Sequence, residues 1–155
     1  MEEIILAIDP GVNGALAYKN IKTGDITLKK MPKGMTCICD CISDISKSFK
    51  IKQAYLEKIT APHRVGNSAS SSVTFGRNCG HIESSLYCFG IPTREVPATR
   101  WQQPLGTLPK EYKAKKKFIK EIMARRYPQL TVIEQVADAL GILDWALNNT
   151  RNGKK

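Results

Sequence analysis

The sequence lacks a long apolar run, because no stretch approaches the ~20 consecutive apolar residues that a membrane-spanning helix requires. It also lacks the pattern of a secretory signal, since Glu2 and Glu3 lead directly into the first predicted strand. No internal repeat is present. These absences favour an intracellular, cytoplasmic protein. With 155 residues, 42% of them hydrophobic, the chain is predicted to form one globular domain.

A disulfide framework is not expected either. The chain has five cysteines, an odd number in a domain that can build its own core, so reduced thiols are predicted. Cys37 and Cys41 share the apolar side of a predicted helix with Ile42 and Ile45. Cys39 points away from them and no second cluster completes four zinc ligands, so we interpret these cysteines as core thiols.

Acidic residues are scarce beside basic ones: 14 Asp and Glu against 24 Lys and Arg give a formal net charge of +10. The excess falls at residues 151–155 and in one short stretch that contains Lys110, Lys113, Lys115, Lys116, Lys117, Lys120, Arg125 and Arg126. A basic surface of this kind favours a polyanionic partner, above all nucleic acid. A solvated helix followed by a soluble tail is the alternative interpretation.

Hydrophobic periodicity and turn residues predict an α/β fold. Strands are expected at 3–9, 14–18, 25–31, 53–58 and 91–96, and helices at 37–49, 73–89, 111–127 and 132–148. The first three strands form an antiparallel meander, and the last two are reached through helices and so run parallel to the first. Residues 1–148 are therefore predicted to form a mixed five-stranded sheet flanked by helices, followed by a basic, flexible tail at 149–155.

Three acids stand in apolar surroundings. Asp9 ends the first predicted strand beside a Pro-Gly turn, Glu57 ends the fourth strand, and Asp138 lies in an apolar helical stretch. If the two strands are adjacent and parallel, both carboxylates emerge at the same edge of the sheet, and a helix packed through its alanines could bring Asp138 there. A buried ionised carboxylate is costly without a cation as partner.

Carboxylates on rigid elements indicate a particular metal chemistry. Three or four oxygen ligands suit Mg²⁺ or Mn²⁺ and not zinc. Two such ions ~4 Å apart would activate a water and stabilise the leaving oxygen of a phosphodiester. Each acid alone could be a helix cap, a surface partner or a turn former, but turn chemistry does not explain all three.

Several of these motifs together resemble those of RuvC-type Holliday junction resolvases in the RNase H-like superfamily. They are Ile-Asp-Pro-Gly at 8–11, Asn-Gly-Ala at 13–15, the strand-end Glu57, and Ala-Asp-Ala-Leu at 137–140. The order and spacing of the elements match over nearly the whole chain. The compact N-terminus and the Gly-rich second helix are most similar to the phage and viral branch.

The resemblance implies an RNase H-like fold and a nuclease site. It implies that Asp9, Glu57 and Asp138 bind two Mg²⁺ ions, and that a homodimer nicks opposing strands of a four-way junction symmetrically. It also implies that a lysine near the start of the Lys-rich helix contacts the scissile phosphate. Lys116 is the best match, and Lys113 is the alternative.

The chain departs from the family pattern at two places. Many members have an acid or a histidine three residues before the last Asp, where this chain has Gln135. Either Glu134 takes that role, which we favour slightly, or the site has three carboxylates and Gln135 contributes an amide oxygen. Bacterial members place an aromatic residue that stacks on DNA shortly after the strand-end Glu. This chain has Ile59 and Thr60 there, which speaks against base stacking and a strict sequence preference.

Other residues have both a functional and a structural interpretation. The expected DNA contacts are Lys113, Lys115, Lys116, Lys117, Arg64 and Arg100. His63 and Arg64 precede a Ser-rich loop that could embrace DNA or could be only flexible. Trp101 could belong to the core or stack on a base. Gly76 and Gly80 could allow a helix of a second copy to approach closely, or could pack against the sheet.

The function predicted from the sequence is therefore metal-dependent cleavage of branched DNA, with Holliday junctions as the prime substrate. A relaxed nuclease that also cuts forks and flaps is the first alternative. A junction-binding protein without catalysis is the second, against which the three acids argue. Actin-like kinases also bind ATP phosphates at a turn after a first strand, but their fold needs two such domains and this chain has the length of one.

Overall fold

A computed structural model gives the structure of the chain. It describes residues 1–59 and 68–152, the side chains of 150–152 excepted. The predicted DNA contact Arg64, and His63 beside it, therefore lie outside the described residues.

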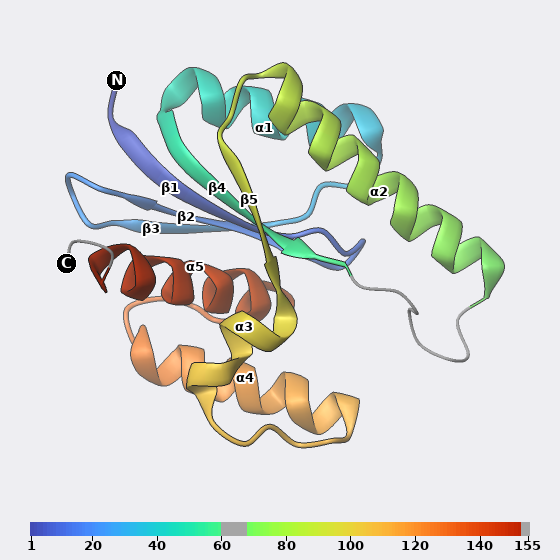
Figure 1. Cartoon of the computed structure of the whole chain (residues 1–155), viewed down its shortest axis with the longest axis vertical. Coiled ribbons are helices and arrows are strands. Elements are labelled where there is room, and N and C mark those ends of the chain that lie inside the picture. The colour runs from blue at the N-terminus through green and yellow to red at the C-terminus, as the bar shows by residue number, and fades with distance from the viewer. Residues whose placement is uncertain (60–67, 153–155) are drawn as a thin grey trace.

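A single mixed sheet forms the centre of the molecule (Figure 1). Its strand order is β3-β2-β1-β4-β5, and the bounds are β1 Glu3–Asp9, β2 Ala15–Asn20, β3 Ile26–Lys30, β4 Lys50–Lys58 and β5 Thr93–Pro97. The pairs β1–β2 and β2–β3 are antiparallel, whereas β1–β4 and β4–β5 are parallel. The predicted sheet is confirmed.

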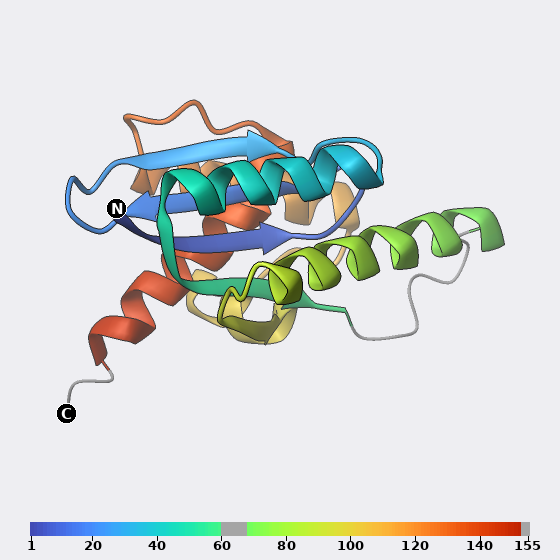
Figure 2. The same cartoon turned by 90° about the horizontal axis from the view of Figure 1, so that it is seen from above.

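Helices cover both faces of this sheet (Figures 1 and 2). The bounds are α1 Met35–Ser48, α2 Ala69–Cys88, α3 Ala98–Gln102, α4 Tyr112–Arg126 and α5 Glu134–Asn152, with a 3₁₀ turn at Gln103–Leu105. The helices α1 and α2 lie on one face, α5 lies on the other, and α4 packs on α5. In the described part of the chain, no helix is both long and apolar enough to cross a membrane.

The central strand β1 is buried on both sides, which is why it reads as a continuous apolar run. Ile4, Leu6 and Ile8 face the core that contains α1, while Ile5 and Ala7 face the core that contains α5. This alternation follows from the two-residue period of a strand. It fixes the end of β1, and hence Asp9, between two packed layers.

The helix α2 begins earlier than predicted. It starts at Ala69 instead of Val73, so the end of the predicted Ser-rich loop is helical. The side chain of Ser68 caps the helix by accepting a hydrogen bond from the backbone N–H of Ser71 at 3.1 Å. The N-terminal half of α2 extends beyond the sheet (Figure 2).

Other boundaries also differ from the sequence prediction; for example, β4 begins at Lys50 and not at residue 53. The segment around Trp101, for which neither a helix nor a strand was predicted, forms the short helix α3. The last helix continues to Asn152 and not to Asn148, so it takes up the first part of the predicted tail at 149–155. Residues 153–155 lie outside the described part of the chain.

The cysteines are free, as predicted, but the predicted apolar side of α1 is wrong by about one residue. The buried residues of α1 are Ile38, Ile42 and Ile45, and Cys37 is exposed. Cys39 is half-buried, with its Sγ 3.0 Å from the Oγ of Ser85 in α2. The cysteines of α1 are therefore exposed or only half-buried, and the prediction that they are core thiols is wrong for Cys37.

Candidate active site

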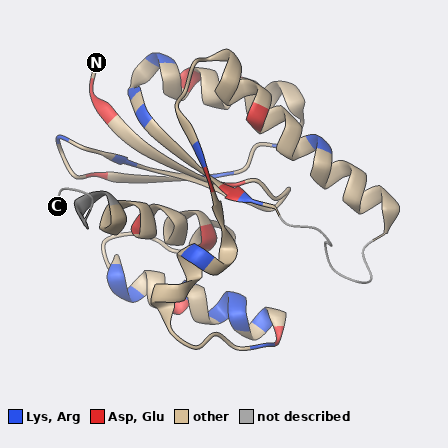
Figure 3. Cartoon of the chain, viewed as in Figure 1, with Lys and Arg blue, Asp and Glu red and all other residues tan. Residues whose placement is uncertain are grey.

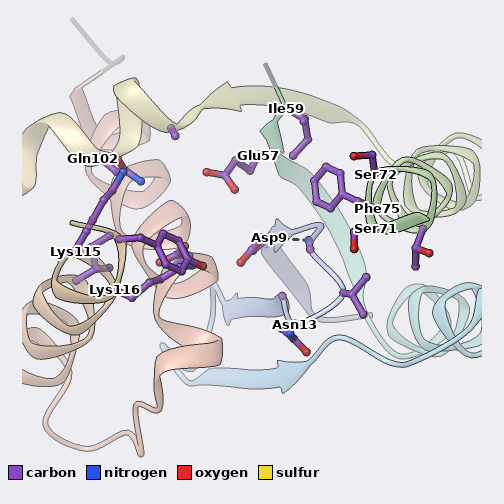
Figure 4. A pocket seen from close by; sticks show the side chains of 18 of the residues that line it. Asp9, Asn13, Glu57, Ile59, Ser71, Ser72, Phe75, Gln102, Lys115 and Lys116 are labelled. Atoms are coloured by element: carbon purple, nitrogen blue, oxygen red, sulfur yellow. Dashed lines mark hydrogen bonds and ion pairs between the residues drawn. The ribbon is translucent and has the colours of Figure 1, made fainter. Parts of the chain in front are cut away.

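The three predicted acids meet at one edge of the sheet. Asp9 is the last residue of β1 and Glu57 is near the end of the adjacent parallel strand β4. Asp138 lies on α5, which packs against β1 and β2. All three line one cavity of ≈830 Å³, into which the side chains of Asp9 and Glu57 point in Figure 4.

The turn after β1 fixes Asp9. The backbone N–H of Gly11 donates a hydrogen bond to Asp9 Oδ1 at 3.2 Å. A Cβ at Gly14 would lie 2.1 Å from the Asp9 carbonyl oxygen, so only glycine fits there. The side-chain amide of Gln135 donates to the Gly14 carbonyl at 3.3 Å and so ties the turn to α5.

Glu57 is held by an aromatic donor. The indole N–H of Trp101 in α3 donates to Glu57 Oε1 at 3.1 Å. Trp101 is 1% exposed, so it belongs to the core, and a stacking role on DNA is excluded by its burial. The sequence left its role open, because no pattern connects two residues 44 positions apart.

Asp138 is buried and forms an ion pair with a lysine. The ammonium of Lys116 on α4 forms an ion pair with Asp138 Oδ2. The other oxygen, Oδ1, is buried and has no hydrogen-bond partner. A buried carboxylate oxygen without a partner is costly, so this atom marks a place for a cation or a donor.

Burial and neighbouring charges of the same sign shift the pKa values of the carboxylates in the cavity. Burial, reinforced by the charge of Asp138, raises the pKa of Asp9 to about 6. Burial and then the charge of Asp9 raise the pKa of Glu57 to about 7. Burial is the largest single influence on Lys116 and would lower its pKa, but the charge and hydrogen bond of Asp138, together with the charge of Asp9, outweigh burial and raise the pKa. Three carboxylates therefore lie close enough together to disfavour one another's ionised forms, and Lys116 is the cation paired with one of them.

These residues fit a hard divalent cation. Within residues 1–59 and 68–152, no three His, Cys, Asp or Glu side chains are already gathered around a single point. The donors at the cavity are nevertheless carboxylate oxygens, the ligands that Mg²⁺ and Mn²⁺ prefer. Asp138 Oδ1, buried and unpartnered, is available for such an ion.

Two helices form the walls of the cavity (Figure 4). One wall is the start of α4 and the segment just before it, with Lys110, Tyr112, Lys115 and Lys116. The opposite wall is the start of α2, with Ser70, Ser71, Ser72, Thr74 and Phe75. The Ser-rich segment was predicted as a loop that could embrace DNA, and its helical form was not predicted, because a run of serines is typical of a loop and not of the first turns of a helix.

Some predicted site residues lie outside this cavity. Glu134, the first residue of α5, is exposed, and neither it nor Gln135 lines the cavity. The predicted fourth ligand stays a prediction. Lys113, Lys117 and Arg100 are exposed beside the cavity without lining it. Figure 3 shows Lys and Arg positions along α4 and at α3.

This chain is similar to solved structures. No protein-family model matches this chain, and no curated protein sequence does. The structure of T. thermophilus RuvC in complex with a Holliday junction substrate matches with a TM-score of 0.65 and 14% sequence identity, over 97% of this chain and 96% of that chain. A second Thermus thermophilus RuvC structure matches with a TM-score of 0.64 and 15% identity, over 97% and 96% of the two chains. The chain therefore has the RuvC form of the RNase H-like fold.

Proposed function

We propose that this protein is a metal-dependent endonuclease that cleaves branched DNA, with Holliday junctions as its prime substrate. The observation that carries the proposal is the convergence of Asp9, Glu57, Asp138 and Lys116 in one cavity. The RuvC-like fold supports the choice of substrate, since similar solved structures include a RuvC bound to a Holliday junction. A fold alone does not define a reaction, so the site carries the argument.

The carboxylates are the proposed metal ligands. Asp9, Glu57 and Asp138 would hold two Mg²⁺ ions, for which Mn²⁺ would substitute. When bound, these ions supply activation of the attacking water and stabilisation of the charge that develops on the phosphate. The protein holds its ligands in place through Gly11 and Trp101, each of which donates to one carboxylate oxygen.

The lysines supply positive charge for the DNA backbone. Lys116 lies among the carboxylates, paired with Asp138, and its ammonium would contact the scissile phosphate once the carboxylates hold metal ions. Lys110 and Lys115 line the same cavity from the α4 side, where they would bind neighbouring phosphates. The Ser and Thr residues at the start of α2 line the opposite side of the same cavity and would contact the DNA backbone from there.

Symmetric cleavage of a four-way junction requires two such cavities, so we propose a homodimer. Gly76 and Gly80 of α2 support this arrangement, because a Cβ added at either position would meet no described atom within 4 Å. They therefore do not serve close packing against the sheet, which was the alternative interpretation. An intracellular location and a relationship to phage and viral resolvases remain predictions.

The test uses labelled DNA. The protein is incubated with Mg²⁺ and a synthetic four-way junction, a fork or a linear duplex, and incisions are mapped on every strand. We expect paired nicks at symmetric positions of the junction and little cutting of the duplex. Equal cutting of all three substrates would contradict a junction resolvase, and binding of the junction without incision would favour the non-catalytic alternative.

The matched variants are Asp9→Asn and Asp25→Asn. Asp9 lines the cavity, whereas Asp25 is exposed in the turn between β2 and β3. Asp9→Asn is expected to reduce cleavage by at least about 10²-fold, by loss of a metal ligand, while binding of the junction persists. Asp25→Asn is expected to behave as the unsubstituted protein. Unchanged cleavage and Mg²⁺ dependence in Asp9→Asn would mean that the acids do not form the site.

A further inference from the structure

We infer that Trp101 is a positioning residue for metal binding, which it serves by holding the Glu57 carboxylate through its indole N–H. This inference rests on the proposed function, because it assumes that Glu57 binds a divalent ion. It adds a residue that touches neither the metal nor the DNA.

The contact is direct and shielded from water. Trp101 Nε1 lies 3.1 Å from Glu57 Oε1, and the Trp101 side chain is 1% exposed. A hydrogen bond to an ionised acceptor is stronger than one between neutral groups, and more so where water is excluded. Because the donor takes Oε1, it fixes the rotation of the carboxylate and leaves Oε2 for a ligand in the cavity.

The indole itself cannot move freely. It belongs to the core between the sheet and α5, and a Cβ built on Gly141 of α5 would lie 2.6 Å from Trp101 Cζ3. The ring therefore rests directly on the backbone of α5 at a place where no side chain fits. Asp138 lies on the same helix, less than one turn before Gly141. Trp101 thus connects the Glu57 carboxylate to the helix that carries Asp138.

Residues that hydrogen-bond a metal ligand without touching the metal have measurable effects on metal affinity. Loss of such a partner typically weakens metal binding by about 10- to 100-fold. The effect arises because the freed carboxylate must be ordered when the ion binds. A residue that only fills the core would change stability without changing metal affinity.

The first experiment compares Trp101→Phe with Trp145→Phe. Trp145 is buried in the same core and packs edge-on against Tyr55, so Trp145→Phe removes a second buried indole from the same core without removing the hydrogen bond to Glu57. Binding of Mn²⁺ is measured without DNA, by calorimetry or by the loss of the free-ion electron paramagnetic resonance signal, beside thermal unfolding. We expect about 10-fold or greater weakening for Trp101→Phe and less than twofold for Trp145→Phe. Equal Mn²⁺ affinities of the two variants would overturn the inference.

A second measurement keeps Trp101 in place, so it tests the positioning role even if Trp101→Phe does not fold. The indole ¹H–¹⁵N resonances of Trp101 and Trp145 are followed by nuclear magnetic resonance during addition of Mg²⁺. The Trp101 signal is expected to shift on addition of Mg²⁺ and in Glu57→Gln, while the Trp145 signal stays. A Trp101 signal that responds to neither would overturn the inference.

The two proposals fail in different ways. If the unsubstituted protein and Glu57→Ala bind Mn²⁺ equally, or neither binds it, the proposed metal site is wrong and this inference falls with it. If Glu57→Ala loses Mn²⁺ binding but Trp101→Phe retains it, only the positioning role of Trp101 is wrong.

Discussion

At the scale of single residues, the cavity concentrates like charges that the fold must hold together. Asp9 and Glu57 have raised pKa values because burial disfavours their ionised forms, and a neighbouring carboxylate adds to this: Asp138 for Asp9, and Asp9 for Glu57. A carboxyl whose folded pKa is raised contributes stability below its unfolded pKa, and this contribution is lost as the pH rises through the folded value. For these residues the loss spans the range from the ordinary values near 4 to about 6 for Asp9 and about 7 for Glu57.

The first prediction follows for Glu57→Gln. In the presence of a chelator, this variant should be more stable than the unsubstituted protein at pH 8, by about 1–3 kcal/mol, because one repelling charge is gone. At pH 4.5 the two proteins should differ little, since Glu57 is then largely protonated. Gln still accepts the Trp101 hydrogen bond. Chemical denaturation at both pH values measures the difference.

The control for this prediction is Glu121→Gln. Glu121 is an exposed acid of α4, so the same loss of charge occurs without burial. Its stability should follow that of the unsubstituted protein at both pH values. Repulsion at Glu57 does not limit stability if Glu57→Gln loses stability between pH 4.5 and pH 8 as steeply as the unsubstituted protein does.

The second prediction concerns the turn that holds Asp9. In Gly14→Ala the new Cβ would lie 2.1 Å from the Asp9 carbonyl oxygen, so the turn must shift. We expect a loss of more than about 2 kcal/mol in the free energy of unfolding. Gly76→Ala is the matched control, because its Cβ meets no described atom and alanine favours a helix by up to about 1 kcal/mol. Equal stabilities of the two variants would contradict a steric requirement at Gly14.

At the scale of elements, the position of α4 depends on contacts at both of its ends. Near its start, Lys116 pairs with Asp138 of α5. At its C-terminal end, Arg126 pairs with Asp144 Oδ2, and the Tyr127 hydroxyl donates to Asp144 Oδ1 at 2.7 Å. Asp144 is buried, so its two partners satisfy a carboxylate that would otherwise be costly.

The third prediction tests whether the contacts with Asp144 stabilise the fold without affecting metal binding in the cavity. Tyr127→Phe removes one donor to Asp144 and should lower the free energy of unfolding by about 1 kcal/mol. Because Arg126 still pairs with Asp144, α4 should keep its place and the affinity for Mn²⁺ should not change. Thermal unfolding and Mn²⁺ binding measured on the same sample distinguish the two effects. A changed affinity would mean that the end of α4 controls the cavity.

Elements with a strong pattern were predictable from the sequence, and weakly patterned ones were not. β1 was predicted to the residue because its seven residues end at a Pro-Gly turn. The apolar side of α1 was misplaced because Cys37 and Cys41 were counted as core residues beside Ile42 and Ile45, and Ile38, which is buried, was not counted. The start of α2 was misplaced because Ser70, Ser71 and Ser72 have low helix preference, which the Ser68 cap overcomes.

At the scale of the whole molecule, the site consists of residues from elements that meet only in the folded chain. The juxtaposition of Asp9 and Glu57 followed from the sequence, since neighbouring parallel strands end at the same edge. The contacts of Lys116 with Asp138 and of Trp101 with Glu57 span 22 and 44 residues and depend on how helices pack. No local pattern encodes such packing, so these contacts required the structure.

The last prediction concerns the charge of the molecule, which is +10 overall and concentrated beside the cavity at α4. Each phosphate neutralised by a lysine adds close to one unit to the slope of log affinity against log salt concentration. Binding of a four-way junction, measured by fluorescence anisotropy in a chelator, should therefore weaken steeply between about 50 and 200 mM salt. Lys115→Ala should reduce the slope by about 1, because Lys115 lines the cavity. Lys22→Ala removes the same charge from the turn between β2 and β3, at the opposite end of β1, and should leave the slope unchanged. If both substitutions change the slope equally, the junction is bound by the net charge of the protein and not by the surface around the carboxylates.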